Sequence, residues 1–163
     1  MDNFEQRIIE LKESQKQGFL HSYEHPPVDM TDFPDLIMSC DRADIKYRHN
    51  LDMYEIHRLE KYSWTPTFLL NLLEMCKQTS LLENSNIIGF IQESSGSGYG
   101  WHDDLFDIVI TNVCGTTTWE FEDGTSQLMK PFDVMYVPKG VRHTVTSHSP
   151  RFTASIGCNL VPD

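Results

Sequence analysis

The chain is poor in basic residues, and this limits the partners that it can bind. Its 163 residues include 13 lysines and arginines against 24 aspartates and glutamates, which gives a formal net charge of −11. Proteins that bind nucleic acid present a basic face to the phosphates, so we expect no nucleic-acid partner. An acidic surface suits a basic partner, but a solvated acidic surface is the commoner explanation of such a charge.

Long apolar runs and paired cysteines are also lacking. The longest apolar runs are far shorter than a membrane-spanning helix, and the acidic, polar start of the chain lacks the pattern of a signal peptide. The four cysteines stand far apart without a Cys-x-x-Cys pair, which disfavours a structural zinc site. We therefore expect a cytoplasmic protein with free thiols and no membrane partner.

What is present is the composition of one globular domain. Hydrophobic residues make up 39% of the chain and charged residues 23%, and this length suffices for a substantial core. The sequence has no internal repeat and no linker, so we expect a single domain over residues 1–163. Within it we predict a helical or mixed N-terminal layer at residues 1–85 and a β-barrel core at residues 86–163.

The first predicted helix covers residues 2–17. Phe4, Ile8 and Leu11 recur at helical spacing, and Gly18 is a natural stop. The apolar stripe predicts that this helix packs on the β-barrel. Pairing with a second copy of the chain, as a homodimer, is the less favoured alternative.

The second predicted helix is recognised by its start. Thr65 is a candidate N-cap and Pro66 suits the first helical position, and the apolar stretch that follows continues to about Lys77. Residues 19–64 have no clear pattern, although residues 36–40 are apolar enough for a short strand.

The C-terminal half is predicted to be a series of short strands. Residues 87–91 form an apolar run typical of a strand buried on both faces, and residues 94–98 predict a flexible turn. Asp123-Gly124 is a strong hairpin signal. Short strands separated by turns are typical of an antiparallel sandwich or barrel. We predict further strands at residues 106–114, 116–122, 133–137, 144–146 and 152–160.

Two histidines and one aspartate are the strongest candidates for a functional site. His102 and Asp104 form a His-x-Asp pair, and His143 lies near the end of another β-rich stretch. Alternate residues of a strand point to the same side, so the pair can reach one metal while Asp103 points away. Two histidines and a carboxylate form the facial triad of non-haem Fe(II) sites, which leaves positions open for substrate and oxygen.

The motifs around these residues resemble those of the cupin superfamily. Gly96 precedes His102 by six residues, as in the first cupin motif, and the run Pro138-x-Gly140-x-x-His143 is similar to the second. The resemblance implies a double-stranded β-helix, a jelly-roll barrel, for roughly residues 88–157. The predicted fold class is therefore mostly β with a helical N-terminal layer.

A more specific pattern resembles the JmjC-like Fe(II)/2-oxoglutarate-dependent oxygenases, and within them the ribosomal oxygenase group. This pattern is His102-x-Asp104-x-x-Asp107, followed by Gly115 and Trp119. The resemblance implies that His102, Asp104 and His143 bind Fe(II), that 2-oxoglutarate is the cosubstrate, and that the reaction is a hydroxylation. Its substrate is expected to be a protein or peptide side chain, or a small molecule.

One position departs from the family pattern. Thr117 stands where the family has a Lys or Arg that binds the distal carboxylate of 2-oxoglutarate, and a threonine cannot supply that charge. Arg151, eight residues after His143, is the preferred substitute. Further hydrogen bonds to the cosubstrate are expected from Tyr99, Asn112 and Asn159.

Other interpretations stay open. Thr117 favours a cupin metalloenzyme that does not use 2-oxoglutarate, such as a small-molecule dioxygenase or an isomerase. A non-enzymatic binding module with a cupin-like barrel is the other alternative. Among neighbouring residues, Asp103 and Asp107 are expected to face solvent or to cap turns, and Trp101 and Trp119 are expected in core or rim packing. Residues expected on the surface or in satisfied core positions are His21, His25, His49, His57 and His148.

Overall fold

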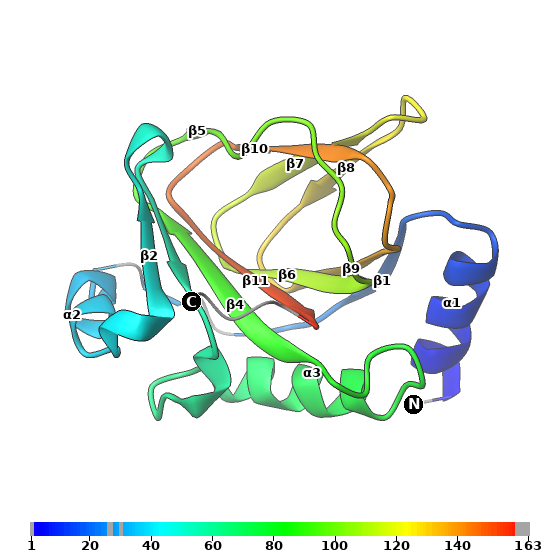
Figure 1. Ribbon diagram of the computed structural model, residues 1–163, viewed down its shortest axis with the longest axis horizontal. Coiled ribbons are helices and arrows are strands. Elements are labelled where there is room, and N and C mark those ends of the chain that lie inside the picture. Colours follow the sequence, from blue (N-terminus) through cyan, green and yellow to red (C-terminus); the bar gives the residue numbers. More distant parts are fainter. Residues whose placement is uncertain (1, 26–27, 30, 159–163) are drawn as a thin grey trace.

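The described part of the chain forms two antiparallel sheets that face each other, with three helices outside the larger sheet (Figure 1). The computed structural model describes residues 2–25, 28–29 and 31–158. The helices are α1 (Asp2–Glu13), α2 (Phe33–Met38) and α3 (Thr67–Lys77). The strands are β1 (Gly18–Ser22), β2 (Ile45–Arg48), β3 (Met53–Ile56), β4 (Asn86–Gln92), β5 (Gly96–Ser97), β6 (Ile108–Cys114), β7 (Thr117–Phe121), β8 (Ser126–Met129), β9 (Asp133–Val137), β10 (His143–Ser147) and β11 (Arg151–Gly157).

The larger sheet draws strands from both halves of the sequence. Its order is β1-β9-β6-β11-β4-β3-β2, and the smaller sheet has the order β5-β10-β7-β8. The N-terminal part is therefore mixed rather than mostly helical, because three of its strands extend the sheet that the C-terminal part builds. The molecule is mostly antiparallel β with few helices, and none of the helices in the described segments is long and apolar enough to cross a membrane.

The two faces of strand β11 lie in different surroundings. Phe152, Ala154 and Ile156 belong to the apolar core that the larger sheet shares with the three helices. The alternate residues of a strand point to the opposite face. A second apolar cluster lies between the two sheets, and it contains Ile108, Ile110, Trp119, Phe121, Met129, Met135, Val137 and Val145.

The first helix is confirmed but is shorter than predicted. It ends at Glu13 because Gln15 adopts a left-handed conformation (φ 53°) and the Lys16 amide donates to the Leu11 carbonyl (2.9 Å). The chain then turns into β1, which pairs with β9. Gly18 thus opens a strand five residues after the end of the helix.

Two local predictions in the N-terminal part are wrong. Residues 36–40 are not a strand, because residues 36–38 belong to the helix α2. Pro34 suits the start of this helix, and Phe33 and Ile37, four residues apart, are both buried. Thr65 is not the N-cap of α3, because Pro66 occupies that position. The Thr65 hydroxyl instead donates to the carbonyl of Leu59.

Each strand predicted in the C-terminal half is found, with ends that differ by up to three residues. The strand predicted at 106–114 begins at Ile108, and that predicted at 152–160 ends at Gly157, with residues 159–160 outside the described residues. The glycine-rich run at residues 94–98 also contains the short strand β5. The hairpin at Asp123-Gly124 joins β7 to β8. Gly115, between β6 and β7, has a positive φ of 81°, and a Cβ at this position would lie 2.3 Å from the Pro150 carbonyl oxygen. Only glycine fits where these two turns approach each other.

Candidate metal centre

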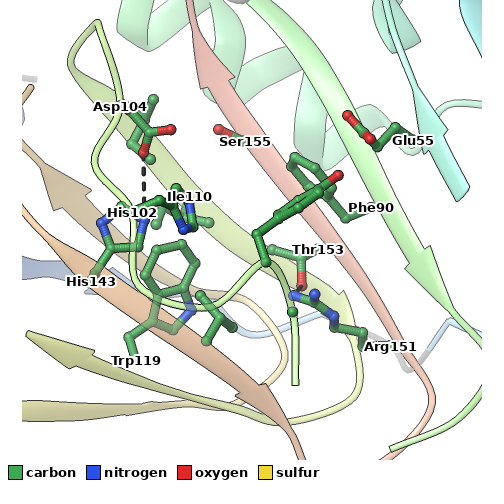
Figure 2. A pocket seen from close by; sticks show the side chains of 14 residues that line it. Glu55, Phe90, His102, Asp104, Ile110, Trp119, His143, Arg151, Thr153 and Ser155 are labelled. Carbon is green, nitrogen blue, oxygen red and sulfur yellow. Dashed lines mark hydrogen bonds and ion pairs between the residues drawn. The ribbon is translucent and has the colours of Figure 1, made fainter. Parts of the chain in front are cut away.

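The structure brings the three predicted metal ligands together. Ligand atoms of His102, Asp104 and His143 all lie within 4.8 Å of one another, an arrangement that can hold a metal ion (Figure 2). The spacing predicted that His102 and Asp104 lie on one strand. They lie instead in the segment between β5 and β6. His102 reaches His143 through a backbone bridge, in which each amide donates to the other carbonyl at 2.9 and 2.8 Å.

The hydrogen bonds of the two imidazoles fix which nitrogen faces the centre. Nδ1 of His102 lies 2.8 Å from the Gly100 carbonyl oxygen, and Nδ1 of His143 lies 2.9 Å from the Val141 carbonyl oxygen. A carbonyl oxygen only accepts, so each Nδ1 donates and each Nε2 keeps its lone pair in the neutral ring. Nε2 of His143 lies 3.5 Å from Oδ2 of Asp104.

Burial keeps His143 in the form that binds metals. Its pKa is lowered from the ordinary value, chiefly by desolvation, while the hydrogen bond to Val141 and the charge of Asp104 act in the opposite direction. A neutral imidazole is the ligand form of histidine. The aromatic ring of Trp119 lies 5.0 Å from the His143 ring, centroid to centroid, and shields it from solvent.

A cavity of about 240 Å³ opens beside the triad. The triad lies on one side of this cavity and Arg151 on another (Figure 2). Trp119 packs between the sheets, as predicted, but it also lines the cavity. The remaining lining residues are Glu55, Phe90, Gly98, Tyr99, Ile108, Ile110, Val145, Thr153 and Ser155.

Arg151 carries a positive charge that lacks a carboxylate partner within the part of the chain that the structure describes. Its side chain is 4% exposed, and Nε donates to Oε1 of Gln92 (3.3 Å) while one terminal nitrogen donates to Oγ1 of Thr153 (3.2 Å). Burial lowers the pKa of Arg151 to about 10. A buried charge among neutral groups is costly unless an anion joins it, so Arg151 is suited to bind one.

The predicted residues Asn112 and Thr117 lie behind the cavity wall rather than in it. The Thr153 hydroxyl donates to Oδ1 of Asn112 (2.7 Å), whose Nδ2 donates to Oγ1 of Thr117 and to the Met129 carbonyl, both at 3.0 Å. The two residues thus hold Thr153, which in turn accepts a hydrogen bond from Arg151. The second predicted amide, Asn159, lies outside the described residues.

Glu55 is a cavity residue that sequence reasoning missed. In the register of the larger sheet it pairs with Phe90, which pairs with Thr153, so one row across β3, β4 and β11 faces the cavity. Desolvation favours the neutral carboxyl, but interactions with His57, Tyr99 and Arg48 outweigh it and lower the pKa of Glu55 to about 2. The short stretch Met53–Ile56 carries no pattern that reveals this role.

The predictions for other residues near the triad are confirmed in part. Asp103 is exposed, as expected, and so are Arg142 and His148. The expectation for Asp107 is only half right: its carboxylate does accept the Lys139 amide in a turn at 2.9 Å, but it is buried and lies 3.2 Å from Nζ of Lys12. Asp107 therefore ties α1 to the segment that carries the metal ligands.

Comparisons with known proteins show a shared fold but no family. No family model matches the chain, and no curated protein matches it either. The ribosomal oxygenase YcfD of Escherichia coli matches with a TM-score of 0.68 and 13% identity, over 91% of this chain and 49% of that one. The structure of YcfD in complex with cobalt and succinic acid matches with a TM-score of 0.63 and 14% identity, over the same shares.

These matches set the limits of the likeness. The chain spans about half the length of the YcfD structures, and at these identities the likeness shows the fold alone. At the level of the fold, it supports the predicted resemblance to the ribosomal oxygenase group. A cupin-2 domain protein from Shewanella frigidimarina matches only in part, with a TM-score of 0.39 and 20% identity over 45% of this chain and 69% of that one.

Proposed function

We propose that the protein is an Fe(II)- and 2-oxoglutarate-dependent oxygenase that hydroxylates a carbon of a protein or peptide side chain, or of a small molecule. The observation that carries this proposal is the pairing of two features in one cavity. The triad of His102, Asp104 and His143 offers a metal centre, and Arg151 offers a buried charge for an anion.

The donor set fits ferrous iron. Two imidazoles with Nδ1 bound to backbone carbonyls and one carboxylate are the ligand types of non-haem iron oxygenases, and three protein ligands leave the other positions open. When bound, iron and 2-oxoglutarate supply the oxidising chemistry: oxygen puts one atom into the substrate and the other into succinate, with release of CO2. The protein holds the ligands and excludes water.

The cavity also fits a dicarboxylate. The guanidinium of Arg151 and the hydroxyl of Thr153 lie side by side in its wall, and the network through Asn112 holds them in place. A charge-assisted hydrogen bond from Arg151 would bind the distal carboxylate in place of the family's basic residue at Thr117. The YcfD complex with succinic acid supports this reading, because succinate is what remains of 2-oxoglutarate after the reaction.

Apolar side chains complete the cavity around the metal centre. Ile110, Trp119 and Val145 lie in its wall and belong to the cluster between the sheets. Such a lining excludes bulk water and strengthens the electrostatic interactions of a bound substrate. A hydrophobic C–H group of the substrate is suited to this wall.

An anaerobic titration tests the proposal. The iron-loaded protein is titrated with 2-oxoglutarate, and we expect a weak visible metal-to-ligand charge-transfer band that is lost in His102→Ala and His143→Ala. Under oxygen, the same protein should form succinate. Iron binding without the band and without succinate contradicts the cosubstrate.

A second candidate is a cupin metalloenzyme that does not use 2-oxoglutarate. The observation that favours it is Thr117, whose buried hydroxyl is engaged by Asn112 and which offers no positive charge. This candidate predicts tight metal binding, no charge-transfer band and the same activity with or without 2-oxoglutarate. A protein that fails to bind iron in the titration would instead be a binding module.

A further inference from the structure

We propose that Tyr99, held by Glu55 and Arg48, is a positioning residue that sets the metal affinity of the triad, and this presupposes the proposed metal centre. Tyr99 lies three residues before His102, in the segment between β5 and β6 that carries two of the three ligands. Glu55 and Arg48 come from the hairpin of β2 and β3, far away in the sequence.

The ligand-bearing segment is tethered to the smaller sheet by its backbone. The Gly98 amide donates to the Val145 carbonyl (2.9 Å), and His102 and His143 exchange two backbone hydrogen bonds. The Gly140 amide donates to the Asp104 carbonyl (3.0 Å). These bonds fix the segment on the side of β10. Its C-terminal end continues into β6 of the larger sheet, and near Tyr99 its attachment to that sheet is made by side chains.

Tyr99 provides such an attachment. The guanidinium carbon of Arg48 lies 5.6 Å from the centroid of the Tyr99 ring. Burial and the interaction of its hydroxyl with the Glu55 carboxylate raise the pKa of Tyr99. The ring also meets Phe90 of β4 edge-on, with the centroids 6.2 Å apart. The side chain therefore bridges from the ligand-bearing segment to three neighbouring strands of the larger sheet.

Glu55 is itself a fixed anchor. Its side chain is buried, and Oε2 accepts a hydrogen bond from Nε of Arg48 at 2.6 Å. Oε1 lies 3.7 Å from Nε2 of His57. A buried carboxylate with these partners stays charged and interacts favourably with the tyrosine hydroxyl.

The path from Tyr99 to the metal centre is short. Gly100 follows with a positive φ of 80°, and its carbonyl accepts the Nδ1 hydrogen bond that orients the His102 ring. The rings of Tyr99 and His102 also meet edge-on, 5.9 Å apart. A shift of Tyr99 thus moves the group that sets the tautomer and direction of a ligand. Loss of such outer partners typically costs about 10–100-fold in metal affinity.

The test uses cobalt(II) as the probe, since its ligand-field absorption reports both occupancy and geometry. Tyr99→Phe removes only the hydroxyl, and we expect cobalt affinity to fall about tenfold or more, with an altered ligand-field spectrum. Tyr47→Phe is the matched control, because the Tyr47 hydroxyl donates to Oδ1 of Asp52 (2.7 Å) on the same hairpin, away from the cavity. The control should bind cobalt like the original protein.

A second pair of variants separates positioning from folding. Glu55→Gln keeps an oxygen that accepts the tyrosine hydroxyl, so it should retain more cobalt affinity than Glu55→Ala, and metal-free unfolding midpoints are measured for all variants. Equal cobalt affinity in Tyr99→Phe and Tyr47→Phe would overturn the positioning role while the metal centre stands. Failure of the original protein to bind cobalt would overturn both.

Discussion

At the scale of single residues, Arg151 has the most to gain from a bound dicarboxylate. We predict that Arg151→Ala raises the half-saturating concentration of 2-oxoglutarate about 10–100-fold, because a charge-assisted hydrogen bond is worth ~1.5–3 kcal/mol. Iron affinity should stay near its original value, since Arg151 does not belong to the triad. The measurement is succinate formation against cosubstrate concentration.

Arg142→Ala is the control for this prediction. Arg142 is exposed and stands next to His143 in the sequence, so its loss removes the same charge without touching the cavity. An unchanged cosubstrate requirement in Arg151→Ala would show that another group binds the distal carboxylate.

Single residues also show what a sequence can and cannot reveal about the site. His102, Asp104 and His143 were predictable because each stands in a motif with fixed spacing. Arg151 was chosen for its distance to His143, and it does line the cavity, while its role toward the cosubstrate stays a prediction. Glu55 was not predictable, because it reaches the cavity only through the register of β3 against β4 and β11, which no local pattern specifies.

At the scale of elements, the turn between β6 and β7 depends on a glycine. We predict that Gly115→Ala lowers the free energy of unfolding by more than ~2 kcal/mol, because the new Cβ meets the Pro150 carbonyl at 2.3 Å in addition to the strain of a positive φ. Gly124→Ala is the control: its φ is also positive (86°), but a Cβ there meets nothing within 4 Å.

Urea unfolding of the two variants measures the difference. The Gly124 variant should lose only the cost of the left-handed conformation, about 1–2 kcal/mol. If both variants lose the same amount, the contact with Pro150 has no effect and the turn tolerates a side chain.

One physical reason explains why strands β2 and β3 could not be predicted from the sequence. Strands β2 and β3 have four residues each, and the chain between them includes Asp52 in a left-handed conformation instead of an Asn-Gly or Asp-Gly pair. They are stabilised by long-range pairing: β2 pairs with β3, and β3 pairs with β4, which begins 30 residues after β3 ends. The C-terminal strands were predictable because their turns carry glycine and their strands carry β-branched residues.

At the scale of the whole molecule, buried carboxylates make the stability depend on acid. The pKa of Glu55 is about 2 in the folded protein against 4.5 for a free side chain, so its contribution is full above about pH 4.5 and is lost as the pH falls toward 2. Desolvation opposes ionisation of Asp44 as well, but Lys61, Tyr62 and Arg58 outweigh it and lower its pKa. We predict a loss of stability between pH 5 and pH 3 in the metal-free protein.

Glu55→Gln provides the comparison for the acid prediction. Its free energy of unfolding should fall less between pH 5 and pH 3 than that of the original protein, by about 1–2 kcal/mol once solvent screening is allowed for. Urea unfolding at the two pH values measures this. Identical pH dependence of the two proteins would contradict the role of Glu55.

The alternation along β11 has a consequence for engineering. Every second side chain of this strand faces the cavity, while those between them pack against the helices. Within the seven residues of β11, one face therefore determines which ligands bind, and the other face stabilises the fold. A library that varies only Thr153 and Ser155 should change which ligands the cavity binds, while the apolar core on the other face of the sheet keeps its packing.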